Sequence, residues 1–321
     1  MNDELSLLKQ WRDEHIKAYT NNHESLNQFH DGLMTKTIQL VIKKVASEQG
    51  TPPAHFAFFL MGSAGRSEQS VWSDQDHGII FEGHGKGHQD YFLRLGKEIS
   101  DALAKVGYEY CDGKVMASNV LWCKSLSEWK EQISSWLIEE SWESLRHFST
   151  FFDSRVLIGE HQLLSSLKEL AFVRLNSNPR LYLRLLENVS HIKKGVGLFG
   201  QLIPIDTGEE TGSINLKEKV FFSYVNSLRL LALKEKISEP STLSRFMLLA
   251  DDYKNIKDYQ NDFVSLLQYR LYFQQNSTSY EGVHYLKLES LTKKEKQEIK
   301  RIMKRGYKLF SETRAIIEKG D

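Results

Sequence analysis

The sequence has few cysteines, and their scarcity excludes two kinds of stabilisation. Only 2 of the 321 residues are cysteine, Cys111 and Cys123. Two are too few for a disulfide framework, and they lack the paired spacing of a zinc-finger site. The pattern is typical of a protein in a reducing compartment. We therefore expect a cytoplasmic location and no structural metal.

The chain also lacks an excess of charge and a long apolar run. Lys plus Arg and Asp plus Glu number 42 each, so the molecule offers no positive excess to a nucleic-acid backbone or an anionic membrane. No apolar run approaches the roughly 20 residues of a spanning helix, and the charged N-terminus is unlike a signal peptide. We expect neither a nucleic-acid nor a membrane partner.

The first part of the chain alternates between helical and strand patterns. The spacing of apolar residues predicts one or two helices over residues 4–48. Short apolar runs at 54–61 and 76–82 predict two buried strands, and a helical pattern follows at 89–106. A third strand is expected within 108–119. Strands and helices in this order predict an α/β opening.

The second part reads as a helical bundle, because long amphipathic stretches follow one another from Ser125 onward. They cover residues 126–138, 142–158, 162–175, 181–194, 216–235, 242–272 and 292–317. A glycine-rich segment at 195–213 is long for a connection inside a compact domain, which indicates a functional or mobile segment.

These patterns together predict an α+β protein of three parts. N-terminal helices occupy residues 1–49, a sheet with flanking helices occupies 50–124, and an all-α helical bundle occupies 125–321.

The segment 62–76, GSAGRSEQSVWSDQD, joins the first two predicted strands and gathers the residues that carry chemistry. At the end of a buried strand, Gly62 and Ser63 allow backbone amides and a hydroxyl to approach phosphate oxygens. Asp74 and Asp76 are two positions apart, so on an extended segment their carboxylates project from one face and converge on one ion. Such oxygen ligands suit Mg²⁺ or Mn²⁺. The segment predicts a metal-nucleotide site.

Simpler interpretations exist for the same residues. Taken alone, Asp74 and Asp76 could belong to a solvated turn with a helix cap, but the upstream glycines favour the site. Arg66 could contact a phosphate through its guanidinium or anchor the turn. Glu68 is expected to support the loop.

This segment resembles the nucleotidyltransferase domain of bacterial uridylyltransferases that modify PII signalling proteins, and more closely the related DUF294 nucleotidyltransferases. Both groups fall in the DNA polymerase beta superfamily. The shared pattern is G-[GS]-x-G-R-x-E-x5-D-x-D, met by Gly62, Ser63, Gly65, Arg66, Glu68, Asp74 and Asp76. Similar segments follow from Cys111 to Trp122, where C-x-G-x-x-M-A-x-N-x-x-W is met, and at 152–155, where an F-D-x-R helix is expected. The resemblance covers roughly residues 25–275.

The resemblance implies a polymerase-beta-like sheet and the attack of an acceptor hydroxyl on the α-phosphate of a nucleoside triphosphate. Asp74 and Asp76 would be the catalytic metal ligands. The nucleotide contacts would come from Gly62, Ser63, Arg66, Ser73 and Lys217. The superfamily usually adds a third carboxylate from a later strand, for which Glu109 and Asp112 are the candidates and Asp153 is a more distant one.

Three functions fit these residues. A nucleotidyltransferase acting on a protein hydroxyl is preferred, because the resemblance points to modifiers of signalling proteins. A nucleotide-sensing protein with weak turnover is favoured by the lack of a convincing third carboxylate. A small-molecule nucleotidyltransferase would need an acidic cleft for a cationic acceptor. The sequence selects neither uracil nor adenine and does not define the oligomeric state.

Overall fold

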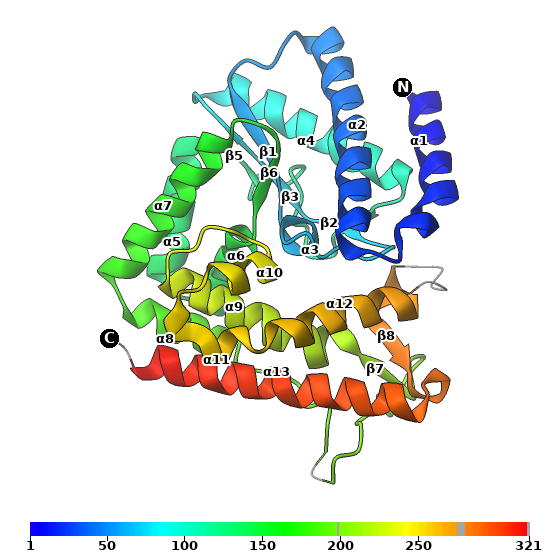
Figure 1. The fold of residues 1–321 in the computed structure, drawn as a ribbon. Coiled ribbons are helices and arrows are strands. Elements are labelled where there is room, and N and C mark those ends of the chain that lie inside the picture. The colour runs from blue at the N-terminus through cyan, green and yellow to red at the C-terminus, as the bar shows by residue number, and fades with distance from the viewer. Residues whose placement is uncertain (198, 275–279, 320–321) are drawn as a thin grey trace. The chain divides into compact units, whose positions relative to one another are not determined.

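The computed structural model describes residues 1–197, 199–274 and 280–319. By its internal contacts the chain divides into two compact units, Met1–Ser177 and Asn178–Asp321, whose elements are labelled in Figure 1. Within the described ranges, no helix combines the length and the apolar character that crossing a bilayer requires.

The first unit begins with two helices, as predicted. Helix α1 spans Asn2–His15 and helix α2 spans His23–Gln49, with a short 3-10 turn between them. The Asn22 side chain caps α2 by accepting a hydrogen bond from the Ser25 amide at 3.0 Å. Gly50 ends the helix at a φ of +88°, which favours glycine.

A four-stranded mixed sheet forms the centre of this unit, in the order β5-β3-β1-β6. Its strands are β1 (Phe56–Leu60), β3 (His77–Phe81), β5 (Cys123–Ser125) and β6 (Arg155–Gly159). The central strand β1 is antiparallel to both β3 and β6, and β3 is parallel to β5. Strands β1 and β3 confirm the two strands predicted at 54–61 and 76–82.

Helices cover both faces of the sheet (Figure 1). They are α4 (Lys86–Val106), α5 (Leu126–Glu139), α6 (Trp142–Phe152) and α7 (His161–Ser177). The ring centres of Phe56 on β1 and Phe92 on α4 are 5.3 Å apart. Those of Phe59 on β1 and Trp129 on α5 are 5.7 Å apart. Because alternate strand residues point to opposite faces, β1 fills both cores.

Three predicted elements differ in the structure, one of them the stretch 242–272, where separate helices cover Thr242–Leu248, Lys254–Lys257 and Gln260–Gln274. The stretch 142–158 was expected to be one helix, but α6 ends at Phe152 and the F-D-x-R residues lead into strand β6. Within 108–119, only β4 (Glu109–Tyr110) is a strand, paired in parallel with β2 (Asp74–Gln75). Short apolar runs carry no strong period, so pairing with distant strands decides their conformation.

The contact-based division also falls later in the chain than the predicted boundary at 124/125. The first unit extends to Ser177, because α5, α6 and α7 pack against the sheet or against one another and β6 is one of its strands. The pattern of amphipathic stretches cannot show whether a helix packs on a sheet or on other helices.

The second unit is mainly helical and contains one small sheet. Its longer helices are α8 (Arg180–Asn188), α9 (Phe222–Lys234), α10 (Thr242–Leu248), α12 (Gln260–Gln274) and α13 (Lys293–Lys319). Phe246, Phe263 and Leu309 are fully buried at its core. Strands β7 (Ser213–Asn215) and β8 (Tyr285–Lys287) pair in an antiparallel sheet. A small sheet therefore accompanies the predicted helical bundle.

The glycine-rich segment belongs to this unit, and residue 198 within it lies outside the described residues. The Gly195 amide donates a hydrogen bond to the Tyr307 hydroxyl of α13 at 2.5 Å. The Gly212 amide donates to the Ile205 carbonyl at 2.9 Å. These contacts join the segment to α13 and close a turn before β7.

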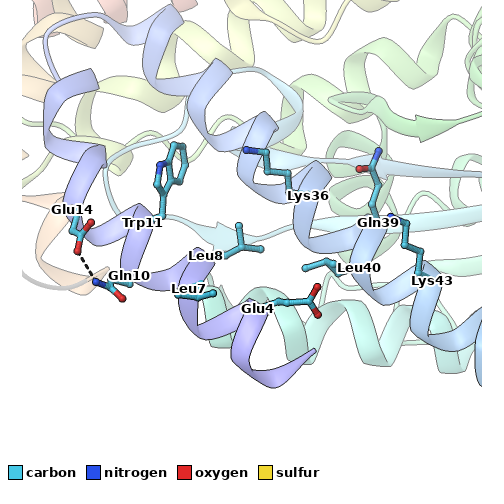
Figure 2. Close-up of a pocket in the computed structure, with 10 residues that line it drawn as sticks. All are labelled: Glu4, Leu7, Leu8, Gln10, Trp11, Glu14, Lys36, Gln39, Leu40 and Lys43. Atoms are coloured by element: carbon cyan, nitrogen blue, oxygen red, sulfur yellow. Dashed lines mark hydrogen bonds between the residues drawn. The ribbon is translucent and has the colours of Figure 1, made fainter.

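A groove of about 650 Å³ lies along helices α1 and α2 (Figure 2). Three leucines are among its lining residues, and Lys36 Nζ lies 5.4 Å from the centre of the Trp11 ring. Its full lining is Glu4, Leu7, Leu8, Gln10, Trp11, Glu14, Lys36, Gln39, Leu40 and Lys43. This lining shares no residue with the segment 62–76.

Candidate functional site

The glycine turn and the second aspartate are in direct contact. Strand β1 ends at Leu60, and Gly62 begins a single helical turn, α3 (Gly62–Gly65), with a φ of +56°. A Cβ atom built on Gly62 would lie 2.0 Å from Oδ2 of Asp76. The Met61 amide also donates to the Asp76 carbonyl at 2.8 Å. Only glycine permits this approach of turn and carboxylate.

Gly65 permits a second close approach, between α3 and the segment that follows α6. A Cβ on Gly65 would lie 2.0 Å from the carbonyl oxygen of Asp153 and 2.9 Å from that of Leu60. The F-D-x-R residues therefore pack directly against the glycine turn. The motif glycine is required by this contact between backbones.

Arg66 anchors the turn. Its Nε donates to Glu68 at 2.7 Å and its Nη1 donates to Asp153 at 2.9 Å, and both carboxylates are buried. Burial alone would lower the pKa of Arg66, but the two negative charges outweigh it and hold that pKa above its ordinary value. Arg66 was predicted either to contact a phosphate or to anchor the turn, and these contacts favour the second role. They also give Asp153 a partner on the turn.

Asp74 and Asp76 project from one side of an extended segment. Both are half-buried, whereas Ser73, Gln75 and His77 between and beside them are buried. This alternation is the period of an extended chain. It is the arrangement that the spacing of the two aspartates predicted.

Buried side chains hold the segment from its inner side. Gln75 donates to the carbonyls of Ser100 and Tyr108 at 3.0 and 3.2 Å. His77 Nδ1 accepts from the Ala117 amide at 3.1 Å, so Nε2 carries the proton and donates to Gln75 at 2.9 Å. Burial lowers the pKa of His77 to about 3, and the ring is neutral.

Three side chains from α1 and α2 fix the loop that leads to Asp74. The side-chain oxygen of Asn27 accepts a hydrogen bond from the backbone amide of Gln69 at 3.0 Å. The backbone carbonyl of the next residue, Ser70, accepts a hydrogen bond from His30 Nε2 at 2.9 Å. Arg12 Nη2 donates to the backbone carbonyl of Val71 at 3.1 Å. Burial, followed by the Arg12 charge, lowers the pKa of His30 to about 3. The N-terminal helices thus support the candidate site.

A thiol, not a third carboxylate, completes the cluster. Among the residues that the structure describes, one group of three ligand atoms converges within 4.8 Å, from Asp74, Asp76 and Cys111. The two carboxylate candidates, Glu109 and Asp112, are exposed and outside this group. Burial, then the charge and hydrogen bond of Asp76, raises the pKa of Cys111 to about 12.

Sequence reasoning missed Cys111 as a site residue although it opens the C-x-G segment. Strands β2 and β4 pair Asp74 with Glu109 and Gln75 with Tyr110. Extending this parallel register by one residue sets Cys111 beside Asp76. Each strand is two residues long, too short to leave a pattern in the sequence.

The remaining predicted nucleotide contacts differ in setting. Ser63 is half-buried in the turn. Ser73 is 3% exposed, and its hydroxyl accepts from Gln69 and donates to the Asp74 carbonyl, both at 3.2 Å. Its contacts favour support of the loop. Lys217 is an exposed residue of the second unit, and its contact with a nucleotide stays a prediction.

A mixed sheet with a glycine turn after strand β1 and an Asp-x-Asp pair facing that turn is consistent with a nucleotidyltransferase domain. Residues 6–143 match the family described as "Putative nucleotidyltransferase DUF294". Residues 179–315 match its companion, the "Putative nucleotidyltransferase substrate binding domain". The chain belongs to the DUF294 family, as its motifs predicted. No curated protein gave a match to the chain.

Proposed function

We propose that this protein is a metal-dependent nucleotidyltransferase that moves a nucleoside monophosphate from a triphosphate to an acceptor hydroxyl. The observation that carries the proposal is the convergence of Asp74 and Asp76 in one cluster, with the Asp76 carboxylate against Gly62. In a chain of this family, that arrangement brings a metal-binding pair to a turn that a phosphate can approach.

The residues present fit a divalent cation. Two carboxylates and a thiol offer three ligand atoms within 4.8 Å of one another, and Asp74 and Asp76 supply the oxygens that hold such an ion in a phosphoryl-transfer site. When bound, the cation stabilises charge on the transferring phosphoryl group and on the pyrophosphate that leaves.

The protein's own residues position the reacting groups. Gly62 presents no side chain, so a phosphate can approach the backbone beside Asp76, and Ser63 offers a hydroxyl to a phosphate oxygen. Arg66 holds the turn through Glu68 and Asp153. Alignment of the acceptor hydroxyl with the α-phosphate then supplies much of the rate acceleration.

A protein hydroxyl is the acceptor that we propose, at a site in the cytoplasm. The similarity of the Gly62–Asp76 motif to transferases that modify PII proteins supports a protein substrate. The equal numbers of acidic and basic residues, 42 each, disfavour a polynucleotide. Both cysteines are free thiols, which suits a reducing compartment.

One observation favours a second function, that of a nucleotide sensor with weak turnover. Beside Asp74 and Asp76 lies the Cys111 thiol, where the superfamily usually supplies a carboxylate that helps to activate the acceptor. A protein of this kind would bind the metal nucleotide and transfer little of it.

Binding is tested by thermal unfolding with and without divalent metal and each nucleoside triphosphate. A ligand at about one hundred times its Kd adds about 2.7 kcal/mol, or several degrees in Tm. The shift should vanish in the double variant Asp74→Asn, Asp76→Asn. It should persist in Asp112→Asn, whose carboxylate is near in sequence but outside the cluster. Equal shifts in wild type and the double variant would refute the assignment.

Turnover is tested by incubating the protein with cell extract and triphosphates labelled at the α- or the γ-phosphate. Nucleotidyl transfer labels a protein band from the α-label alone, whereas phosphoryl transfer does so from the γ-label. Label that appears only on small molecules would indicate a small-molecule acceptor. Binding without transfer to any acceptor would favour the sensor.

A further inference from the structure

Cys111 is set beside Asp76 by the backbone. Strand β4 runs parallel to β2, with Glu109 beside Asp74 and Tyr110 beside Gln75. Cys111 is the next residue, and its sulfur lies within 4.8 Å of a carboxylate oxygen of each aspartate.

The turn that follows Cys111 keeps the sulfur in this place. The Lys114 amide donates to the Cys111 carbonyl at 2.9 Å and closes the turn. The Val115 carbonyl accepts from the His77 amide at 3.0 Å, which ties the turn to the start of β3.

On the Gly62 side of this cluster the turn carries no side chain, so the Asp76 carboxylate lies directly against its backbone. The cluster offers two carboxylate oxygens and one sulfur as ligand atoms. A set of ligands with one sulfur and two oxygens differs from an all-oxygen site in the metal that it prefers. Oxygen ligands suit Mg²⁺, whereas thiolate favours softer divalent ions such as Co²⁺ and Zn²⁺.

We propose that Cys111 is the third protein ligand of the metal site and that it turns the site's preference from Mg²⁺ toward thiophilic divalent cations. This inference rests on the metal dependence of the proposed function. On binding, the sulfur gives a lone pair to the cation and the thiol proton passes to solvent, without any change of oxidation state.

The test is a titration of the full-length protein with Co²⁺, followed by absorption. Visible bands report Co²⁺ binding through any ligands, and a near-ultraviolet charge-transfer band reports a cobalt–thiolate bond. We expect that band in wild type and its loss in Cys111→Ser. The matched control is Cys123→Ser, which changes the other cysteine of the sequence, buried in β5, and should keep the band.

A second measurement needs no variant and covers the case in which Cys123→Ser fails to fold. Iodoacetamide alkylation, located by mass spectrometry, should be slower at Cys111 in the presence of Zn²⁺ than in its absence. Mg²⁺ should protect Cys111 less.

In Cys111→Ser, the ratio of Zn²⁺ to Mg²⁺ affinity should fall by roughly tenfold or more.

The outcomes separate this inference from the proposed function. Co²⁺ bound through Asp74 and Asp76 without a charge-transfer band, or a band that persists in Cys111→Ser, would overturn the role of Cys111 and leave the transferase proposal standing. Failure of Co²⁺, Zn²⁺ and Mg²⁺ to bind, with or without a non-hydrolysable triphosphate, would overturn both.

Discussion

The carboxylate of Asp76 occupies the space that a side chain on Gly62 would need, since a Cβ there would lie 2.0 Å from Oδ2. This relationship joins the two halves of the motif, which lie on either side of a loop. A glycine turn after a strand is common in proteins, and so is an Asp-x-Asp string. Their contact makes them one candidate site.

Gly62→Ala should therefore abolish binding of the metal nucleotide. The substitution displaces Asp76 and also strains a left-handed backbone by about 1–2 kcal/mol. Gly50→Ala is the matched control, because Gly50 also has a positive φ but nothing within 4 Å of its would-be Cβ. Thermal shifts with the metal nucleotide should disappear in the first variant and persist in the second. Retained binding in Gly62→Ala would contradict the proposed contact.

Arg66→Gln should destabilise the fold by about 3 kcal/mol or more, because Glu68 and Asp153 would stay buried without that cation. Arg94→Gln breaks an exposed pair with Glu48 and should cost about 1 kcal/mol or less. Urea denaturation of both variants gives the comparison. Equal losses of stability would show that Arg66 is not the anchor of the turn.

Stability should fall as the pH drops below about 6.5, partly because of His30. The pKa of His30 is about 3 in the folded protein, so between these values the unfolded chain binds a proton that the folded chain does not. The contribution of neutral His30 to the free energy of unfolding is complete above the pKa of the unfolded chain. It decreases as the pH falls below that value, by about 1.4 kcal/mol per pH unit. Urea denaturation at pH 7, 6 and 5 gives the free energy of unfolding at each pH. This free energy should depend less steeply on pH in His30→Gln than in wild type. Identical slopes would contradict the prediction.

Asn27→Ala should loosen the loop before Asp74 and destabilise the protein by about 1–3 kcal/mol, because the buried Gln69 amide loses its acceptor. Asn27→Asp keeps an oxygen at that position and serves as the control. Hydrogen exchange of the 67–73 peptide should accelerate in the alanine variant and change less in the aspartate variant. Unchanged exchange in Asn27→Ala would exclude this support.

The sequence predicts the parts of the site that lie within one continuous pattern. Helix α2 and strand β1 follow from apolar spacing, and the shared face of Asp74 and Asp76 follows from their separation of two residues. Strand β6 escaped prediction because its partner β1 is distant in the chain, and apolar residues before Gly159 fit a helix as well as a strand. Cys111 escaped because two-residue strands set its place.

Asp76 lies at the joint between two ladders. The residues before it, in β2, pair with β4, and the residues after it, in β3, pair with β1 and β5. Inserting or deleting a single residue here would shift one register against the other and turn one of the two acids toward the buried face. A change of length here should therefore disrupt the candidate site even where both aspartates are kept.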